Sequence, residues 1–130
     1  MMNWIRVDTM SWIMALAVVV IAGGVLLHGQ SSQIAPDTAL AYLRHGALVI
    51  DVRTPAEFSA GHLPNAMNIP LQQIESGSPL PLKDKNQVLL LHCQGGIRSA
   101  KATKLLSGMG YVNVFNLGSY SRAEQIVGAR

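Results

Sequence analysis

Apolar residues along the chain fall into one long run near its start and several short runs after it. The long run covers residues 10–27, where Ser11 is the only clearly polar residue, and 18 residues make a helix of roughly 27 Å at about 1.5 Å per residue. That length is near the lower limit for crossing a membrane. The later runs have four to seven residues, the length of buried strands.

Short apolar runs alternate with helical patterns after residue 36. Strands are predicted at residues 47–52, 66–69, 88–92 and 111–117. Helices are predicted to begin at Pro36, after the capping-box signature Thr54-Pro55-Ala56-Glu57, at Leu71, after Gly96 and at Gly118. After Gly96, the residues Ala102, Leu105, Leu106 and Met109 have the spacing of one helix face. This alternation predicts an α/β fold with a parallel sheet covered by helices on both faces.

The order of these segments predicts three parts: residues 1–30 as a transmembrane anchor with its flanks, residues 31–36 as a linker, and residues 37–130 as the folded domain. Trp4 and Trp12 lie at the leading edge of the apolar run, where aromatic rings favour the membrane interface. Arg6 is the basic residue nearest the run, so the positive-inside rule places the domain on the exocytoplasmic, periplasmic side. A cleaved signal peptide and a buried soluble helix are the alternatives.

The composition limits the number of domains and the classes of function that the chain can have. A chain of 130 residues has room for one domain, and its 49% hydrophobic content exceeds what such a domain needs, in keeping with a membrane segment. The net charge of +3 is scattered, with no basic run and few aromatic residues, so nucleic-acid binding has little support. A single cysteine leaves no intramolecular disulfide to form.

That cysteine, Cys93, ends the predicted strand 88–92 and is followed by Gln94-Gly95-Gly96-Ile97-Arg98-Ser99 at the start of a helix. Glycines let successive amide groups turn inward as an anion-binding nest, and the helix start and Arg98 add positive charge. All three effects stabilise a thiolate, the nucleophilic form of cysteine. The alternatives are a small buried hydrophobe and an ordinary glycine turn.

This loop resembles the active-site loop of the rhodanese-like sulfurtransferases, in which four residues separate a cysteine from an arginine. Residues 50–70, which contain Asp51-Val52-Arg53, Glu57-Phe58 and Gly61-His62, resemble the second signature of that family. The sequence departs from the family pattern in two places. Asn65 stands where glycine is common, and Leu117-Gly118-Ser119-Tyr120 replaces the usual leucine-glycine-glycine with a tryptophan downstream. The resemblance covers about the last hundred residues and implies the rhodanese fold, here preceded by one transmembrane helix.

The resemblance implies a membrane-anchored enzyme that moves sulfane sulfur from thiosulfate or a persulfide to a thiophilic acceptor through a Cys93 persulfide. Its partners would be small sulfur-containing anions or protein persulfides and thiols, with no metal or organic cofactor. Cys93 and Arg98 are the expected catalytic residues, although Arg98 can equally hold the loop through a carboxylate. Substrate-binding residues in the loop cradle are expected to be Gln94, Gly95, Gly96, Ile97 and Ser99.

Asp51, Arg53 and His62 are expected to support the site, with a buried salt bridge and a loop-anchoring histidine as the competing interpretation. Loop length favours sulfur chemistry, because related phosphatases carry five residues between cysteine and arginine and this loop has four. The alternative function is a non-turnover sulfane-sulfur carrier or sensing module that serves a protein partner.

Overall fold

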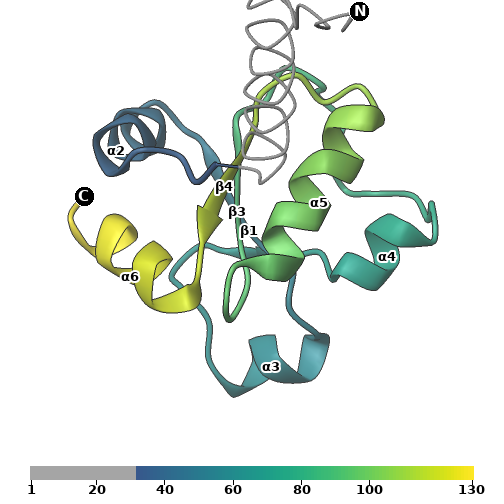
Figure 1. Ribbon diagram of the computed structural model, residues 1–130, viewed down its shortest axis with the longest axis horizontal. Helices are drawn as coiled ribbons and strands as arrows, with labels where there is room; N and C mark the ends of the chain where they lie inside the picture. Colours follow the sequence, from purple (N-terminus) through teal and green to yellow (C-terminus); the bar gives the residue numbers. More distant parts are fainter. Residues whose placement is uncertain (1–31) are drawn as a thin grey trace, which may run out of the picture. The chain divides into compact units, whose positions relative to one another are not determined.

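Four short parallel strands form the centre of the computed structural model, which describes residues 32–130 (Figure 1). They are β1 (Leu48–Asp51), β2 (Met67–Asn68), β3 (Leu89–His92) and β4 (Val114–Gly118), in the spatial order β2-β1-β3-β4. All three pairings are parallel, which confirms the predicted α/β sheet. The predicted membrane segment at residues 10–27 lies outside the described residues. Within residues 32–130, no helix combines the length and apolar character needed to cross a membrane.

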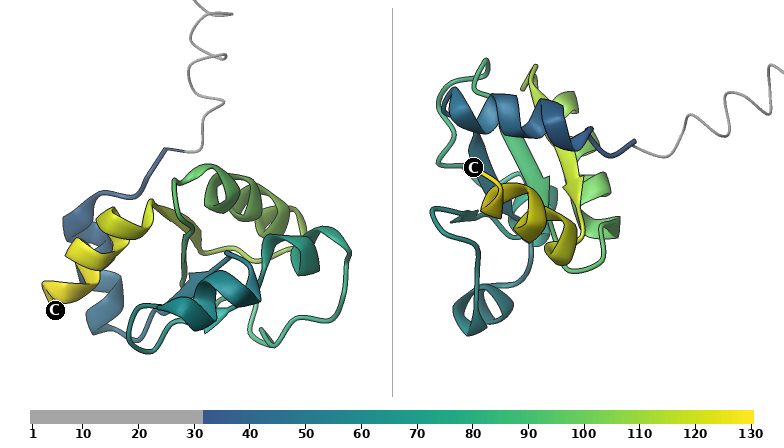
Figure 2. Two further views of the ribbon diagram at one scale, coloured as in Figure 1. Left: turned by 90° about the horizontal axis from the view of Figure 1, so that it is seen from below. Right: turned by 90° about the vertical axis from the view of Figure 1, so that its left-hand side faces the viewer.

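Helices cover both faces of this sheet, as predicted. One face carries α2 (Pro36–Arg44) and α6 (Tyr120–Gly128), and the other carries α4 (Leu71–Glu75) and α5 (Ile97–Gly108), as Figure 2 shows. The short helix α3 (Pro55–Ala60) lies beyond the carboxyl ends of the strands (Figure 1). The carboxyl ends are where open α/β sheets bind ligands.

Side chains of the central strands alternate between two apolar clusters. On β3, Leu89 and Leu91 pack toward α4 and α5, together with Cys93, whereas Leu90 packs toward α2 and α6. Val52 shares the cluster of Cys93. Asp51 is paired with His92 in the register of β1 and β3, and the Val52 amide donates to the His92 carbonyl at 3.0 Å. Val52 and Cys93 therefore follow paired residues and face the same side of the sheet.

Local signals in the sequence account for several boundaries. Thr54 accepts a hydrogen bond from the Glu57 amide while the Glu57 carboxylate accepts from the Thr54 amide, which is the predicted capping box. Asn65 adopts φ of 60°, a conformation that asparagine tolerates better than most residues. An asparagine is therefore compatible with the turn at this position.

Three elements differ from the sequence-based expectation. Gln33 pairs with Asn116, and the Ile34 amide donates to the Asn116 carbonyl at 2.9 Å, so residues 33–34 add to the edge of β4 although the pattern placed them in a linker. Met109 lies just past the end of α5 and is exposed, because the chain turns away there. The last strand begins at Val114 rather than at Tyr111, whose hydroxyl instead donates to the Leu82 carbonyl.

Candidate active site

Cys93 is the first residue of the tight connection between β3 and α5. Cys93 is buried, with 1% of its surface exposed to solvent. Gly96 has φ of 98°, a left-handed conformation that allows the chain to turn sharply before α5 begins at Ile97. The Cys93 amide donates to the Gly118 carbonyl at 3.2 Å, which ties this connection to the end of β4. The loop is therefore held on both sides by the central strands.

The Cys93 sulfur accepts hydrogen bonds from two backbone amides, Gly96 at 3.0 Å and Ser99 at 3.4 Å. The Ser99 hydroxyl oxygen lies 3.5 Å from the same sulfur. Burial acts to raise the pKa of the thiol, but the Ser99 hydroxyl and the amides of Ser99, Gly96 and Gly95 together lower that pKa below its ordinary value. The geometry therefore favours the thiolate, which is the nucleophilic form.

The rest of the loop faces outward. The Gln94 and Ile97 side chains are exposed, and Ile97 reaches 84% exposure. The Gln94 carbonyl accepts from the Tyr120 amide at 3.1 Å, so the backbone of this residue is fixed while its side chain meets solvent. The predicted cradle thus divides into Gly95, Gly96 and Ser99 around the sulfur, and Gln94 and Ile97 at the surface.

Arg98 extends from the first turn of α5 to α3, where it forms a two-pronged ion pair. Its Nη1 donates to Glu57 Oε1 at 2.7 Å and its Nη2 to Oε2 at 3.0 Å. Hydrogen bonding from Arg98 lowers the pKa of Glu57 to about 2, and Glu57 in turn raises the pKa of Arg98. Of the two roles expected for Arg98, the structure displays the carboxylate contact that holds the loop. Glu57 was expected as part of the capping box and of the second signature, but not as the partner of Arg98.

Asp51 and Arg53 form a buried ion pair beside the loop, in keeping with the competing interpretation. Arg53 Nη2 lies 2.7 Å from Asp51 Oδ2 and donates to the Gly61 carbonyl at 2.8 Å. The Arg53 guanidinium also lies 4.7 Å from the centroid of the Tyr120 ring. These contacts join β1, α3 and α6. No motif in the sequence had indicated that Tyr120 contacts Arg53.

Two histidines near the site have structural contacts. His62 is exposed; its Nδ1 lies 2.9 Å from the Phe58 carbonyl oxygen and its ring stacks on Phe58, so it anchors the segment after α3. His92 is fully buried before Cys93, and burial lowers its pKa. His92 Nε2 is the one buried side-chain nitrogen or oxygen among the described residues that has no hydrogen-bond partner. It lies 3.8 Å from Asp51 Oδ2.

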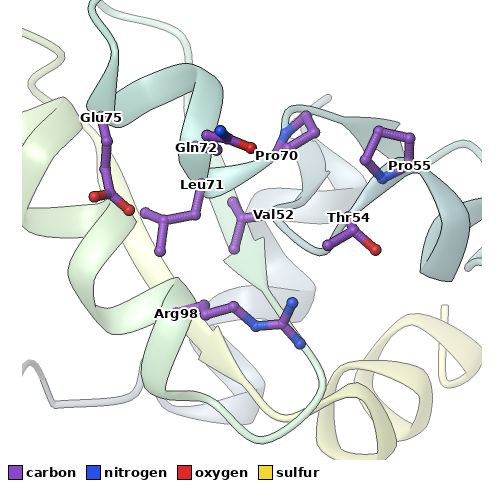
Figure 3. Close-up of a pocket in the computed structure, with 8 residues that line it drawn as sticks. All are labelled: Val52, Thr54, Pro55, Pro70, Leu71, Gln72, Glu75 and Arg98. Carbon is purple, nitrogen blue, oxygen red and sulfur yellow. The ribbon is translucent and has the colours of Figure 1, made fainter.

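A pocket of about 230 Å³ opens between α3, α4 and the start of α5. Figure 3 shows Val52 and Leu71 next to each other, with Arg98 on one side and Pro55 and Pro70 on the other. Thr54, Gln72 and Glu75 complete the lining. Val52 shares an apolar cluster with Cys93 and Arg98 ends the loop, so the pocket lies on the same side of the sheet as the Cys93 side chain. No motif in the sequence had indicated this pocket.

Comparisons with known proteins agree with this architecture. The family model for the rhodanese-like domain matches residues 35–124. The thiosulfate sulfurtransferase PspE of Escherichia coli is 38% identical over 69 residues, which are 53% of this chain and 66% of that protein. A tRNA uridine(34) hydroxylase of Erwinia tasmaniensis is 32% identical over 75 residues, which are 55% of this chain and 21% of that protein. The solved structure of a human single-domain sulfurtransferase matches with a TM-score of 0.61 at 28% identity, covering 72% of this chain and 95% of that one.

Proposed function

Since the chain belongs to the rhodanese-like domain family, we propose that it is a sulfurtransferase that carries sulfane sulfur on Cys93. The donor is thiosulfate or a persulfide, and the acceptor is a thiophilic molecule such as cyanide or a thiol. The observation that carries the proposal is the Cys93 sulfur, which accepts from the Gly96 and Ser99 amides. The similarity to a thiosulfate sulfurtransferase over 69 residues supports the same chemistry.

The reaction has two half-reactions, and each forms one bond to sulfur and breaks one. The Cys93 thiolate attacks the outer sulfur of thiosulfate, an S–S bond forms on the enzyme, and sulfite leaves with the electron pair of the broken bond. The nucleophilic acceptor then attacks the terminal sulfur, and the thiolate is regenerated. The Gly95, Gly96 and Ser99 amides stabilise the anionic sulfur in both states, as an oxyanion hole stabilises an oxyanion.

Loop length supports sulfur rather than phosphate as the transferred group. Four residues separate Cys93 from Arg98, and two of the loop's amides already converge on the single sulfur atom. A phosphoryl group would need donors for three further oxygens. Arg98, the neighbouring cation, is bonded through both terminal nitrogens to Glu57.

Mass spectrometry tests the proposal directly. The purified protein, treated with thiosulfate, is expected to gain the mass of one sulfur atom on Cys93, and cyanide should remove that mass as thiocyanate. Cys93→Ser should retain the fold and neither gain the mass nor turn over, because a hydroxyl cannot form a persulfide. Turnover by the serine variant above a few per cent would contradict the covalent mechanism.

A non-turnover carrier or sensor that serves a protein partner is the second candidate. The observation that favours it is the contrast between Cys93, at 1% exposure, and Ile97, at 84% exposure on the rim of the same loop. An apolar side chain at the rim suits contact with a protein surface. In this case the persulfide would form and persist, and small acceptors would remove it slowly.

The N-terminal run at residues 10–27 leads us to include membrane anchoring in the proposal, with the domain on the exocytoplasmic side. The proposal is supported by the length of this 18-residue apolar run, by Trp4 and Trp12 at its leading edge, and by Arg6. Anchoring would keep the sulfurtransferase domain at the membrane surface, where donor or acceptor proteins can meet it.

A further inference from the structure

His92, the last residue of β3, is fully buried and immediately precedes Cys93, yet the proposed reaction does not use its side chain. Its Nδ1 lies 3.3 Å from the Cys93 carbonyl oxygen. Because a carbonyl oxygen only accepts hydrogen bonds, this contact assigns the proton of the neutral ring to Nδ1. Nε2 then carries a lone pair, and no group in residues 32–130 donates to it. A buried polar atom without a partner costs stability, which points to a role other than packing.

The unpaired Nε2 of His92 lies near a carboxylate on the neighbouring strand. It is 3.8 Å from Asp51 Oδ2, which is too far for a hydrogen bond. The Asp51 carboxylate accepts hydrogen bonds from Arg53, through the backbone amide at 2.9 Å, Nε at 3.0 Å and Nη2 at 2.7 Å. A proton on Nε2 would give Asp51 a second cationic donor. A bond of about 2.9 Å between them requires the two groups to approach by about 0.9 Å.

Besides Asp51, the ionisable side chains around the His92 ring in the described part of the chain are Tyr120 and Arg53. Tyr120, the first residue of α6, meets the ring edge-on, with 5.6 Å between the centroids. Burial lowers the pKa of His92 and Arg53 acts in the same direction, whereas Asp51 raises that pKa. The Cys93 side chain packs toward α5, on the other face of the sheet. Asp51 is therefore the group with which a protonated ring would pair.

Arg53 connects Asp51 to the reactive loop. Its guanidinium lies 4.7 Å from the centroid of the Tyr120 ring, and the Tyr120 amide donates to the Gln94 carbonyl at 3.1 Å. Gln94 directly follows Cys93. Because the interior is closely packed, a movement of Asp51 toward the histidine would lengthen its bonds to Arg53 and disturb the contacts beyond it. The backbone of the reactive loop therefore depends on where the Asp51 carboxylate lies.

Resting on the proposed sulfurtransferase function, we propose that His92 is a positioning residue for the reactive loop, that it acts through Asp51, and that its protonation slows sulfur transfer. The neutral ring leaves the pair of Asp51 and Arg53 intact and the loop in place. A proton taken from solvent on Nε2 makes an imidazolium, which pairs with Asp51 and weakens the hold of that carboxylate on Arg53. Attack by Cys93 then requires both a deprotonated sulfur and a deprotonated Nε2.

The experiment follows persulfide formation on the full chain from sodium thiosulfate, in single turnovers from about pH 4 to about pH 9. Because two groups must lose a proton, the logarithm of the second-order rate constant should rise with a slope of about two at acid pH and then level off. His92→Leu, which is close to histidine in volume and takes up no proton, should reduce that slope to about one. Each profile is normalised to its own plateau, and returning the acid-treated wild type to alkaline pH should restore its rate.

A second variant keeps the contact with the loop backbone. His92→Asn places an amide nitrogen near the position of Nδ1, where it can still donate to the Cys93 carbonyl, and it does not titrate. It should also give a slope of about one, so the test does not depend on the folding of the leucine variant. His45→Asn, at an exposed histidine that caps the end of α2, is the matched control and should leave the slope at about two.

Thermal stability provides an independent readout of the same proton. Because the folded protein lowers the pKa of His92, the unfolded chain binds this proton more readily. Stability is therefore lost as pH falls below 6.5, the ordinary pKa of histidine. The melting temperature of the wild type should fall more steeply below that pH than the melting temperature of either His92 variant.

The outcomes separate this inference from the function on which it rests. A Cys93 persulfide that forms with the same acid slope in the wild type and in both His92 variants would overturn the inference and leave the sulfurtransferase function standing. Absence of a Cys93 persulfide at every pH would overturn both. If His45→Asn lowers the slope as much as the His92 variants do, the second proton does not belong to His92 and the inference is wrong.

Discussion

Arg98 and Glu57 are 41 residues apart in the chain and form a bidentate ion pair between α5 and α3, with nitrogen–oxygen distances of 2.7 and 3.0 Å. Glu57 belongs to the capping box of α3, and Arg98 immediately precedes Ser99, whose amide donates to the Cys93 sulfur. The pair therefore connects the helix beyond the sheet to the loop that holds the thiolate.

If Arg98 acts through Glu57, the effects of removing the two residues should not add. We expect Arg98→Ala to lower the melting temperature and kcat/KM, and Glu57→Gln to have a smaller effect in the same direction. The double variant should resemble Arg98→Ala alone, because each single change already breaks the pair. Additive losses in kcat/KM would show instead that Arg98 contacts the substrate, at a cost of about 2–4 kcal/mol for a lost anion donor.

The same pair predicts a pH dependence of stability. Arg98 lowers the pKa of Glu57 from 4.5 to about 2 in the folded protein, so the folded state favours the carboxylate. The stabilisation is complete above the unfolded pKa and is lost as pH falls from 4.5 toward about 2. The difference in melting temperature between the wild type and Glu57→Gln should be constant above pH 5 and shrink below about pH 4. A difference that is independent of pH would show that the glutamine variant loses packing rather than charge.

Ser99 should set the acidity of Cys93. Its hydroxyl and amide both stabilise the thiolate, and a hydrogen bond to a charged group contributes about 1.5 kcal/mol, or about one pKa unit. Ser99→Ala should therefore shift the pH profile of Cys93 alkylation by iodoacetamide upward by up to about one unit. Ser107→Ala, on the exposed surface of the same helix, is the control and should leave the profile unchanged. An unshifted Ser99→Ala profile would assign the low pKa to the backbone amides alone.

Much of the site could be predicted because its signals are local. The buried strand before Cys93, the glycine turn and the capping box at Thr54 each occupy a few consecutive residues, and the structure contains all three. Glu57 as the partner of Arg98 and Tyr120 as the neighbour of Arg53 could not be found in this way. Those contacts depend on the strand order β2-β1-β3-β4, which brings α3 and α6 to the same end of the sheet, and hydrophobic periodicity does not specify strand order.

The segment before α2 illustrates the same limit. Its polar composition predicted a linker, yet Ile34 is only 8% exposed and its backbone bonds to Asn116 at the edge of β4. Ile34→Ala should lower the free energy of unfolding by about 2 kcal/mol, the low end for a buried isoleucine because the site is at an edge. Urea denaturation measures this loss, and Val112→Ala, at a side chain 65% exposed, should change it by less than about 0.5 kcal/mol. Equal effects of the two variants would contradict a packed role for Ile34.

The last prediction concerns the N-terminal run at residues 10–27, which precedes the described part of the chain. Because an apolar run of 18 residues with two tryptophans at its leading edge favours a bilayer, the intact protein should sediment with membranes and resist carbonate extraction. With Arg6 on the cytoplasmic side, protease added outside the inner membrane should digest the domain while Met1 remains attached to the run. A mature protein that begins near Gln30 would instead identify a signal peptide and an exported enzyme. Protection of the domain from protease would show the opposite orientation. Sulfur transfer would then take place on the cytoplasmic face.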